Sequence, residues 1–312
     1  MVTAEVHSAA ALRHSRQMES HRDRLPDFIA VGPPRTGTTW LHRMLGGHVG
    51  LPRAIKETQF FVWNYSLGLD WYRWYFRGAP RHLPVGEIAP TYFDHPEARE
   101  RIRTAIPRCR IVISLRDPVT RVYSQYKAWH RAGLVEGPFD YAAQCDQLGA
   151  SSSYAFNVRE WRKVFGADNV LVTFYDDLRS SPQAYLDSIC SFIGIARIDL
   201  RQARDADDPV NPSDTGPRSM RLARAAIRLR DALVRRRCAR LASLLWDGTF
   251  LFRLCLSGGP AQLPLAPEID ADLRERLRPE IEDLEQLLGR DLSSWKLPVT
   301  RAQRSGAISS RA

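Results

Sequence analysis

Short apolar runs alternate with helix-like segments along the first two thirds of the chain, and this order limits the folds available to it. The runs DFIAV, RIVISL and NVLVTF have the length and apolar content of buried strands, at residues 27–31, 110–115 and 169–174. Helical patterns lie between and after these runs, from residue 38 to the Gly46–Gly47 pair and over residues 97–106, 118–131, 154–165 and 182–193. Strands that alternate with helices form parallel sheets covered on both faces. We therefore expect an α/β fold with helices on both faces of a parallel sheet.

Neither a repeat nor a glycine- or serine-rich linker divides the chain, so we expect a single α/β domain at residues 27–298. Residues 1–26 are polar and without periodicity, which predicts a flexible tail, and we expect a second tail at residues 299–312. The last third changes to an arginine-rich helix at 218–240, an aromatic-containing segment and a final helix near 268–288. We interpret this part as a helical C-terminal extension of the same domain.

The charge of the chain favours anionic partners, because 45 Lys and Arg residues stand against 35 Asp and Glu, a net charge of +10. The five cysteines are scattered and never in CxxC spacing, which disfavours a zinc site or a disulfide framework and fits a reducing cytosol. The N-terminus lacks the apolar core of a signal peptide, and the apolar run from Leu241 is interrupted by Asp247 and Arg253. We expect a soluble, cytoplasmic protein.

The stretch VGPPRTGTTW, residues 31–40, follows the first predicted strand and opens the first predicted helix. A strand, a glycine turn and a helix start together present free backbone N–H groups to an anion, here from Gly37, Thr38 and Thr39. A Walker A loop reads GxxxxGK[ST], whereas this chain reads GxxxxGTT, with Arg35 two places before the second glycine. The loop therefore predicts a phosphate site of the P-loop type without its usual lysine.

The second strand does not end on a metal-binding acid. Kinases and ATPases of the P-loop type need a carboxylate that holds Mg²⁺, often at the end of a neighbouring strand. RIVISL runs instead into Arg116, and Asp117 precedes Pro118, which is the arrangement of a helix N-cap. We predict no metal ligand here. The surplus of positive charge suits a nucleotide with an extra phosphate.

These two elements together resemble the PAPS-dependent sulfotransferases, whose donor is 3′-phosphoadenosine 5′-phosphosulfate (PAPS). The family's PKxGTTxL element stands here as PPRTGTTWL, and its R-(x)₇-S element as LRDPVTRVYS, with Arg116 and Ser124 at the matching separation. The stretches KETQFF, YSLGLDWYRWYF and GEIAPTYF are similar to the glycan N- and O-sulfotransferases and their bacterial relatives. The phenol and steroid branch uses a catalytic histidine instead. The resemblance runs from about residue 27 to residue 195.

The resemblance implies where PAPS would bind. Arg116 and Ser124 would hold the 3′-phosphate. The 5′-phosphosulfate would lie on the first loop, whose donor-binding positions are Pro34, Arg35, Thr36, Gly37, Thr38, Thr39 and Trp40.

The resemblance also implies catalytic roles. Glu57 would be the general base and Lys56 a second sulfuryl contact, although the two could equally form a surface ion pair. Arg35 replaces the family's lysine, which bridges to the transferred group. Trp40 could stack on adenine or belong to the core. Arg218, in GPRSM, is the candidate for the family's late 3′-phosphate loop.

We therefore expect metal-free sulfuryl transfer from PAPS to a hydroxyl or amine of a carbohydrate, glycolipid or secondary metabolite, and no nucleic-acid partner. The many Arg and Ala residues are typical of a GC-rich bacterial source. One alternative is a P-loop nucleotide or small-molecule kinase, which would need ATP and Mg²⁺. Another is a non-enzymatic binder of nucleic acid or an anionic surface. The arginine-rich helix at 218–240 is either a solvated basic face or a rim that attracts an acidic acceptor or a membrane.

Overall fold

The computed structural model describes residues 24–140, 149–202, 215–238, 241, 258–261 and 264–298. Residues 1–23 and 299–312, where tails are predicted, lie outside the described residues, as does most of the apolar run after Leu241. Arg24 donates hydrogen bonds to the carbonyl oxygens of Pro80 (3.1 Å) and Leu83 (2.8 Å). Among the described residues, contacts with the folded domain thus already include Arg24, ahead of the predicted start at residue 27.

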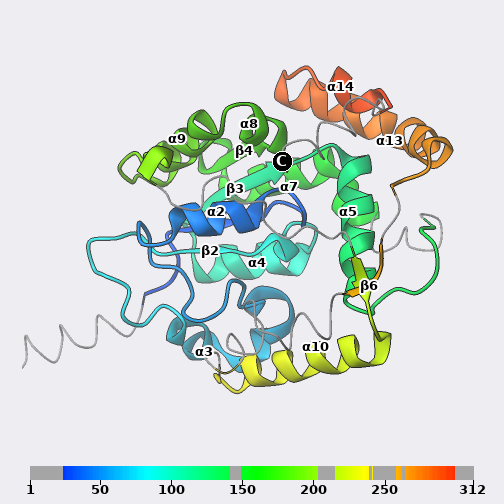
Figure 1. Ribbon diagram of the computed structural model, residues 1–312. Helices are drawn as coiled ribbons and strands as arrows, with labels where there is room; N and C mark the ends of the chain where they lie inside the picture. Colours follow the sequence, from blue (N-terminus) through cyan, green and yellow to red (C-terminus); the bar gives the residue numbers. More distant parts are fainter. Residues whose placement is uncertain are drawn as a thin grey trace, which may run out of the picture.

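A four-stranded parallel sheet forms the centre of the fold, in the order β2-β1-β3-β4 (Figure 1). Its strands are β1 (Phe28–Ala30), β2 (Gly86–Ile88), β3 (Arg110–Leu115) and β4 (Val170–Phe174). All three pairings are parallel, and β1 lies between β2 and β3. The predicted α/β class is confirmed, and the three predicted strands agree with the structure to within a residue at each end.

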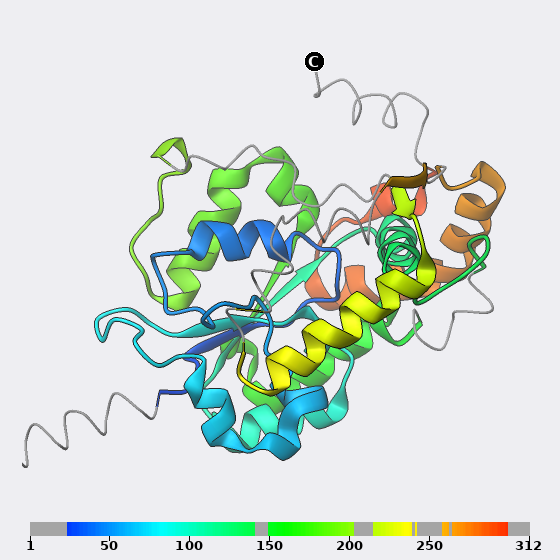
Figure 2. The same ribbon diagram turned by 60° about the horizontal axis from the view of Figure 1, so that its bottom comes forward.

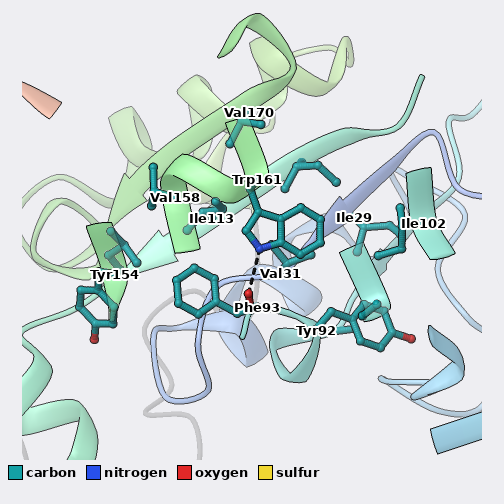
Figure 3. Close-up of a cluster of buried hydrophobic side chains, with 14 of the residues drawn as sticks. Ile29, Val31, Tyr92, Phe93, Ile102, Ile113, Tyr154, Val158, Trp161 and Val170 are labelled. Atoms are coloured by element: carbon teal, nitrogen blue, oxygen red, sulfur yellow. Dashed lines mark hydrogen bonds between the residues drawn. The ribbon is translucent and has the colours of Figure 1, made fainter. Parts of the chain in front are cut away.

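Alternate residues of the strands supply two separate cores, because successive side chains of a strand point to opposite faces. Phe28, Ala30 and Val112 pack on helices α2 (Thr38–Leu45) and α9 (Pro182–Ile193). Ile29, Val31, Ile111 and Ile113 pack on the other face, against α4 (Pro96–Ala105) and α7 (Tyr154–Phe165). Figure 3 shows this second core, where the Trp161 indole N–H donates to the Phe93 carbonyl oxygen at 2.9 Å.

Strand β2 is the strand that the sequence pattern misses. It reads GEI, and the charged Glu87 breaks the apolar run by which a buried strand is identified. All three residues are nevertheless buried, and Ile29 of β1 lies opposite Glu87. Gly86 leaves room for a neighbour, because a Cβ there would lie 2.1 Å from the ring of Phe28.

The connection from α2 to β2 carries a π-helix at Phe60–Asn64 and helix α3 at Leu69–Trp74. Helix α5 (Pro118–Arg131) follows β3, and α8 (Tyr175–Ser180) follows β4. Short 3₁₀ segments complete this part of the fold, at Tyr65–Leu67, Pro90–Tyr92, Ala150–Ser152, Ala167–Asn169 and Leu200–Gln202.

The C-terminal extension contains α10 (Met220–Arg235), α13 (Pro267–Leu288) and α14 (Ser293–Lys296), together with an antiparallel pair of β5 (Thr215–Pro217) and β6 (Gly258–Ala261). Helix α10 begins after the predicted position, because the N-cap is Ser219, whose hydroxyl accepts a hydrogen bond from Leu222 N. The helix runs along the outside of the domain (Figure 2). In the part of the chain that the structure describes, no helix is both long enough and apolar enough to cross a membrane.

Candidate donor and acceptor site

Most of the predicted site residues lie at one edge of the sheet, where the parallel strands end. The β1–α2 loop, the Arg116–Asp117 step after β3 and Tyr175 after β4 all lie at carboxyl ends of neighbouring strands. Ligands of open parallel sheets bind at this edge.

The β1–α2 loop is held tightly against β3. A Cβ on Gly32 would lie 2.3 Å from the carbonyl oxygen of Ser114, so only glycine permits this approach. The hydroxyl of Ser114 donates to the Thr36 carbonyl oxygen at 2.9 Å, and the buried Thr36 hydroxyl donates to the Pro33 carbonyl oxygen at 2.9 Å. The loop is thus fixed before any ligand binds.

The loop opens helix α2 through Gly37, whose φ of 87° lies in the left-handed region that favours glycine. No side chain caps this helix, so its first backbone N–H groups lack a side-chain acceptor. Uncapped N–H groups and the positive end of the helix dipole together favour an anion at Thr38 and Thr39.

The structure brings Arg35, Arg116 and Ser124 into one hydrogen-bonded group. Arg35 Nε donates to Ser124 Oγ at 3.0 Å, and Arg116 Nη1 donates to the Arg35 carbonyl oxygen at 3.2 Å. Burial, followed by the nearby charges of Arg116 and Arg131, lowers the pKa of Arg35 to about 10. Arg35 is therefore still a cation at neutral pH, in a cluster of cations that suits a multiply charged anion.

The sequence analysis missed two residues that lie beside this group, Arg131 and Tyr175. Arg131 lies two turns beyond Ser124 on α5, a spacing that puts both on one face of the helix. Tyr175 follows β4 directly, and the Arg116 guanidinium lies 4.7 Å from the centre of its ring. The seven-residue spacing from Ser124 to Arg131 and the position of Tyr175 after a strand can both be read from the sequence. Neither feature identifies a site residue unless the position of Arg116 in the fold is known.

Asp117 is a helix cap, as predicted. Its Oδ1 accepts hydrogen bonds from the backbone N–H groups of Val119 (2.9 Å) and Thr120 (3.3 Å). Its Oδ2 lies 3.0 Å from Nη2 of Arg274 on α13. Both oxygens of this carboxylate are thus occupied by protein groups. The described residues contain no group of three or more His, Cys, Asp or Glu side chains that could hold a metal ion.

Lys56 and Glu57 lie beside the donor loop. Lys56 Nζ donates to Glu57 Oε1 at 2.6 Å and to the hydroxyl of Thr38, in the first turn of α2, at 3.3 Å. About three quarters of each side chain is buried, with 25% of Lys56 and 22% of Glu57 exposed. The pair predicted from the sequence does form, and it faces the first turn of α2 rather than open solvent.

Gln59 and Thr91 complete the surroundings of Glu57, and the sequence analysis missed both. Gln59 Nε2 donates to Glu57 Oε2 at 2.8 Å, and the Thr91 hydroxyl donates to Gln59 Oε1. Gln59 has a φ of 55°, a left-handed conformation that is uncommon outside glycine. Both carboxylate oxygens of Glu57 are thereby oriented. The sequence gives no signal for the contact between Gln59 and Thr91, which are 32 residues apart.

The buried carboxylate of Glu87 holds the segment that carries Glu57. Glu87 Oε1 accepts from the backbone N–H (2.8 Å) and the hydroxyl (2.6 Å) of Thr58, and Oε2 accepts from the Tyr72 hydroxyl at 2.7 Å. Burial raises the pKa of Glu87, and these hydrogen bonds oppose the rise. Tyr92, in the GEIAPTYF stretch, is fully buried and donates from its hydroxyl to Glu87 Oε2 at 3.3 Å, so it packs in the interior.

Two predicted donor contacts are not joined to this group. Trp40 packs in the α2–α9 core, 8% exposed, with its ring 6.0 Å from that of Tyr185, so the structure supports the packing role and adenine stacking stays a prediction. Arg218 is exposed at the end of β5, and β5 packs beside α5. Among the contacts of the described residues, none joins Arg218 to Arg116 or Ser124.

Comparison with known proteins identifies the family to which the chain is similar. The family model for the sulfotransferase domain matches residues 25–204. The chain is similar to human bifunctional heparan sulfate N-deacetylase/N-sulfotransferase 2, with 29% identity over 198 residues, which cover 55% of this chain and 22% of the human protein. It is also 29% identical to mouse bifunctional heparan sulfate N-deacetylase/N-sulfotransferase 4 over 55% of this chain and 23% of that protein. The match thus spans less than a quarter of these curated relatives.

A solved structure shares the fold. The sulfotransferase from Alicyclobacillus acidocaldarius covers 88% of this chain and 100% of its own, with 21% sequence identity and a TM-score of 0.62. The family match covers more than half of the chain and contains the β1–α2 loop, Glu57, Arg116 and Ser124. The protein therefore belongs to the sulfotransferase family.

Proposed function

We propose that the protein transfers a sulfuryl group from PAPS to a hydroxyl or amine of a carbohydrate, glycolipid or secondary metabolite. The observation that carries this proposal is the convergence of Arg35, Arg116 and Ser124 on the uncapped start of α2. This arrangement offers several cations and hydrogen-bond donors to an anion with more than one phosphate. PAPS carries a 5′-phosphosulfate and a 3′-phosphate, and so matches it.

The reaction needs a base on the acceptor side and positive charge on the donor side. The acceptor oxygen or nitrogen attacks sulfur, the bond between sulfur and the bridging phosphate oxygen breaks, and 3′,5′-bisphosphate leaves. Glu57 takes the acceptor proton. Arg35 and the N–H groups of α2 stabilise the negative charge that develops on the departing phosphate oxygen.

Lys56 lies between the donor loop and the proposed base, Glu57. Its ammonium donates both to Thr38, beside the donor loop, and to the carboxylate of Glu57. A cation at this position can contact the sulfuryl group as it passes from donor to acceptor. Gln59 would keep the second carboxylate oxygen of Glu57 in a fixed orientation during the transfer.

The acceptor class is proposed from the relatives. Their names describe N-sulfotransferases of heparan sulfate, a glycan. These names support only the glycan part of the proposed acceptor range, because the match spans less than a quarter of those proteins. The glycolipid and secondary-metabolite acceptors are proposed from the sequence alone. We keep the cytosol as the proposed location, on the basis of the scattered cysteines.

Peripheral contact with a membrane is proposed as an addition to this function. Leu222 and Leu229 on α10 are 56% and 53% exposed, although large apolar side chains generally pack away from water. They are seven residues apart and therefore share one helix face, beside the exposed Arg221 and Arg228. Sedimentation with anionic and neutral vesicles tests this contact, and Leu229→Glu should abolish the binding to anionic vesicles.

Titration of two nucleotides tests the donor assignment. Adenosine 3′,5′-bisphosphate and adenosine 5′-phosphate differ only in the 3′-phosphate. We expect the protein to prefer the bisphosphate and Arg116→Ala to weaken bisphosphate binding by at least about tenfold, because hydrogen bonds to charged groups contribute about 1.5–3 kcal/mol. Binding of the 5′-phosphate should barely change. Equal losses for both nucleotides would remove Arg116 from the 3′-phosphate site.

A screen of acceptors with PAPS then tests the transfer itself. The expected result is a mass gain of one sulfuryl group on a glycan or small-molecule acceptor. Phosphoryl transfer from ATP in the same screen would favour the kinase alternative instead.

A further inference from the structure

Helices α13 and α14 contact residues that adjoin the donor site in the chain, although both helices lie beyond the region that matches the family. The family match ends at residue 204, whereas α13 and α14 span residues 267–296. Contacts from these helices and from the loop between them reach the residue that follows Arg116 and the two residues that follow Tyr175. No role in the proposed function has yet been assigned to them.

The first contact is a buried ion-pair network around Arg274 of α13. Its side chain is 2% exposed, and its guanidinium lies 3.0 Å from Asp117 Oδ2 and 3.1 Å from Asp270 Oδ2. The same guanidinium donates to the Trp295 carbonyl oxygen in α14. Burial raises the pKa of Asp117, and the charge of Arg274 opposes this rise. Arg274 therefore supplies one positive charge between two buried carboxylates, of which Asp117 is the one next to Arg116.

The second contact fixes the segment that carries Tyr175. The Trp295 indole N–H donates to Asp176 at 2.6 Å, and Arg290 forms two hydrogen bonds with Asp177, at 2.8 and 2.7 Å. The ring of Tyr175 lies under the Arg116 guanidinium. The C-terminal helices thus hold both the backbone next to Arg116 and the backbone next to the ring on which its guanidinium rests.

We infer that Arg274 is a positioning residue for the 3′-phosphate site, and that it acts by neutralising Asp117. This inference rests on the proposed PAPS donor. Asp117 is the neighbour of Arg116 in the chain, and an uncompensated carboxylate there would repel a phosphate and compete with it for the Arg116 guanidinium. With Arg274 in place, the carboxylate caps α5 and the Arg116 side chain stays on Tyr175, Thr120 and the donor loop.

The test compares the two nucleotides across three variants. Arg274→Met should weaken binding of adenosine 3′,5′-bisphosphate by about tenfold and leave binding of adenosine 5′-phosphate within about twofold, because the repulsion acts on the 3′-phosphate. Adding Asp117→Asn to Arg274→Met should restore the preference, since asparagine still caps the helix but carries no charge. Arg276→Met is the matched control, because its ion pair with Asp272 has the same spacing but is exposed.

Several outcomes would overturn the inference. Equal weakening of both nucleotides in Arg274→Met, or no recovery in the double variant, would show that Arg274 only supports the fold. If Arg274→Met does not fold, as judged by its melting temperature, Asp117→Asn alone decides. An increased bisphosphate preference in that variant supports the charge argument, whereas an unchanged or lower preference contradicts it. Failure of the donor assignment is distinct, because then neither the wild type nor Arg116→Ala would depend on the 3′-phosphate.

Discussion

Glu57 is held at both carboxylate oxygens, by Lys56 on one and by Gln59 on the other. A general base must present a lone pair to the acceptor in a fixed direction, and a side chain with two partners loses little further freedom when substrate binds. Lys56 and Gln59 come from the same short segment as Glu57, so a small change of that loop would move all three together.

Glu57→Gln should lower kcat by about 10²–10⁴-fold, the usual contribution of a general base. Affinity for adenosine 3′,5′-bisphosphate should stay nearly unchanged, because the partners of Glu57 are Lys56 and Gln59 and not the residues proposed for the 3′-phosphate. Steady-state kinetics with saturating acceptor and a bisphosphate titration measure the two effects. Glu275→Gln, on the exposed surface of α13, is the control. Wild-type turnover in Glu57→Gln would exclude this residue as the base.

His42 lies one turn after Thr38 on α2, and its Nε2 is buried with no hydrogen-bond partner among the described residues. Burial is the main cause that lowers the pKa of His42 to about 4, and the charge of Lys56 adds to it. The folded pKa thus lies below the unfolded value of about 6.5. Between these values the unfolded chain binds a proton that the folded protein does not, so stability falls as the pH falls from about 6.5 to about 4.

The wild type should therefore lose up to about 3 kcal/mol of unfolding free energy from this group over that interval. Urea unfolding at a series of pH values measures the loss, and His42→Asn should make the dependence shallower. His48→Asn replaces an exposed histidine and is the control. Identical pH dependence in the wild type and His42→Asn would show that the imidazole is not buried in its neutral form.

Site residues could be predicted from the sequence where they belong to a short motif. They could not be predicted where their contacts form only in the folded chain. Arg35, Arg116 and Ser124 are recognised from the spacing within two short stretches, and the structure joins them. Gln59 and Thr91 are far apart in the sequence and meet only because β2 lies beside β1. Their hydrogen bond depends on a strand that the sequence did not reveal.

At the scale of elements, periodicity predicts the longer segments and fails for short ones. Strand β3 and helices α5, α7 and α9 agree with the predicted ranges. The π-helix and α3 were not predicted, because their buried aromatic residues are adjacent in the sequence, as Phe60–Phe61 and Trp71–Tyr72, and give no clear period. The aromatic rings pack on one another, with Phe60 stacked on Tyr72 at 4.6 Å. Such packing is fixed by tertiary contacts rather than by local preference.

The approach of the donor loop to β3 gives a prediction at this scale. Gly32→Ala places a Cβ within 2.3 Å of the Ser114 carbonyl oxygen, and a backbone atom cannot move aside without displacing the strand. We expect a loss of about 2–3 kcal/mol of unfolding free energy, at the upper end of overpacking effects, and weaker binding of adenosine 3′,5′-bisphosphate.

Chemical unfolding and nucleotide titration measure both effects. Gly149→Ala is the matched control, since a Cβ there would have no neighbour within 4 Å. Stability and affinity equal to the wild type in Gly32→Ala would mean that the loop can move away from β3, and that its fixed position is not needed for the donor.

At the scale of the whole molecule, positive charge is concentrated at the donor site, whereas nearby carboxylates are paired with other groups of the protein. The chain has a net charge of +10, and the donor site contains Arg35, Arg116 and Arg131 within reach of one another. Three acidic side chains beside Arg116 and Tyr175 are bound by the protein itself, because Asp117 pairs with Arg274, Asp176 with Trp295 and Asp177 with Arg290. The fold therefore leaves positive charge at the edge of the sheet for an anionic ligand.

This distribution predicts that transfer does not require a metal. An ATP-using P-loop enzyme holds Mg²⁺ with a carboxylate near the end of a neighbouring strand. The carboxylate at that place, Asp117, accepts two backbone N–H groups and pairs with Arg274, so it has no free oxygen to offer a cation. Cations of the protein neutralise the donor instead. Sulfuryl transfer should therefore persist at an unchanged rate after dialysis against a chelator, with a Mg²⁺-dependent kinase inactivated in parallel to show that the chelation worked. Loss of activity that only added Mg²⁺ restores would return the kinase alternative to first place.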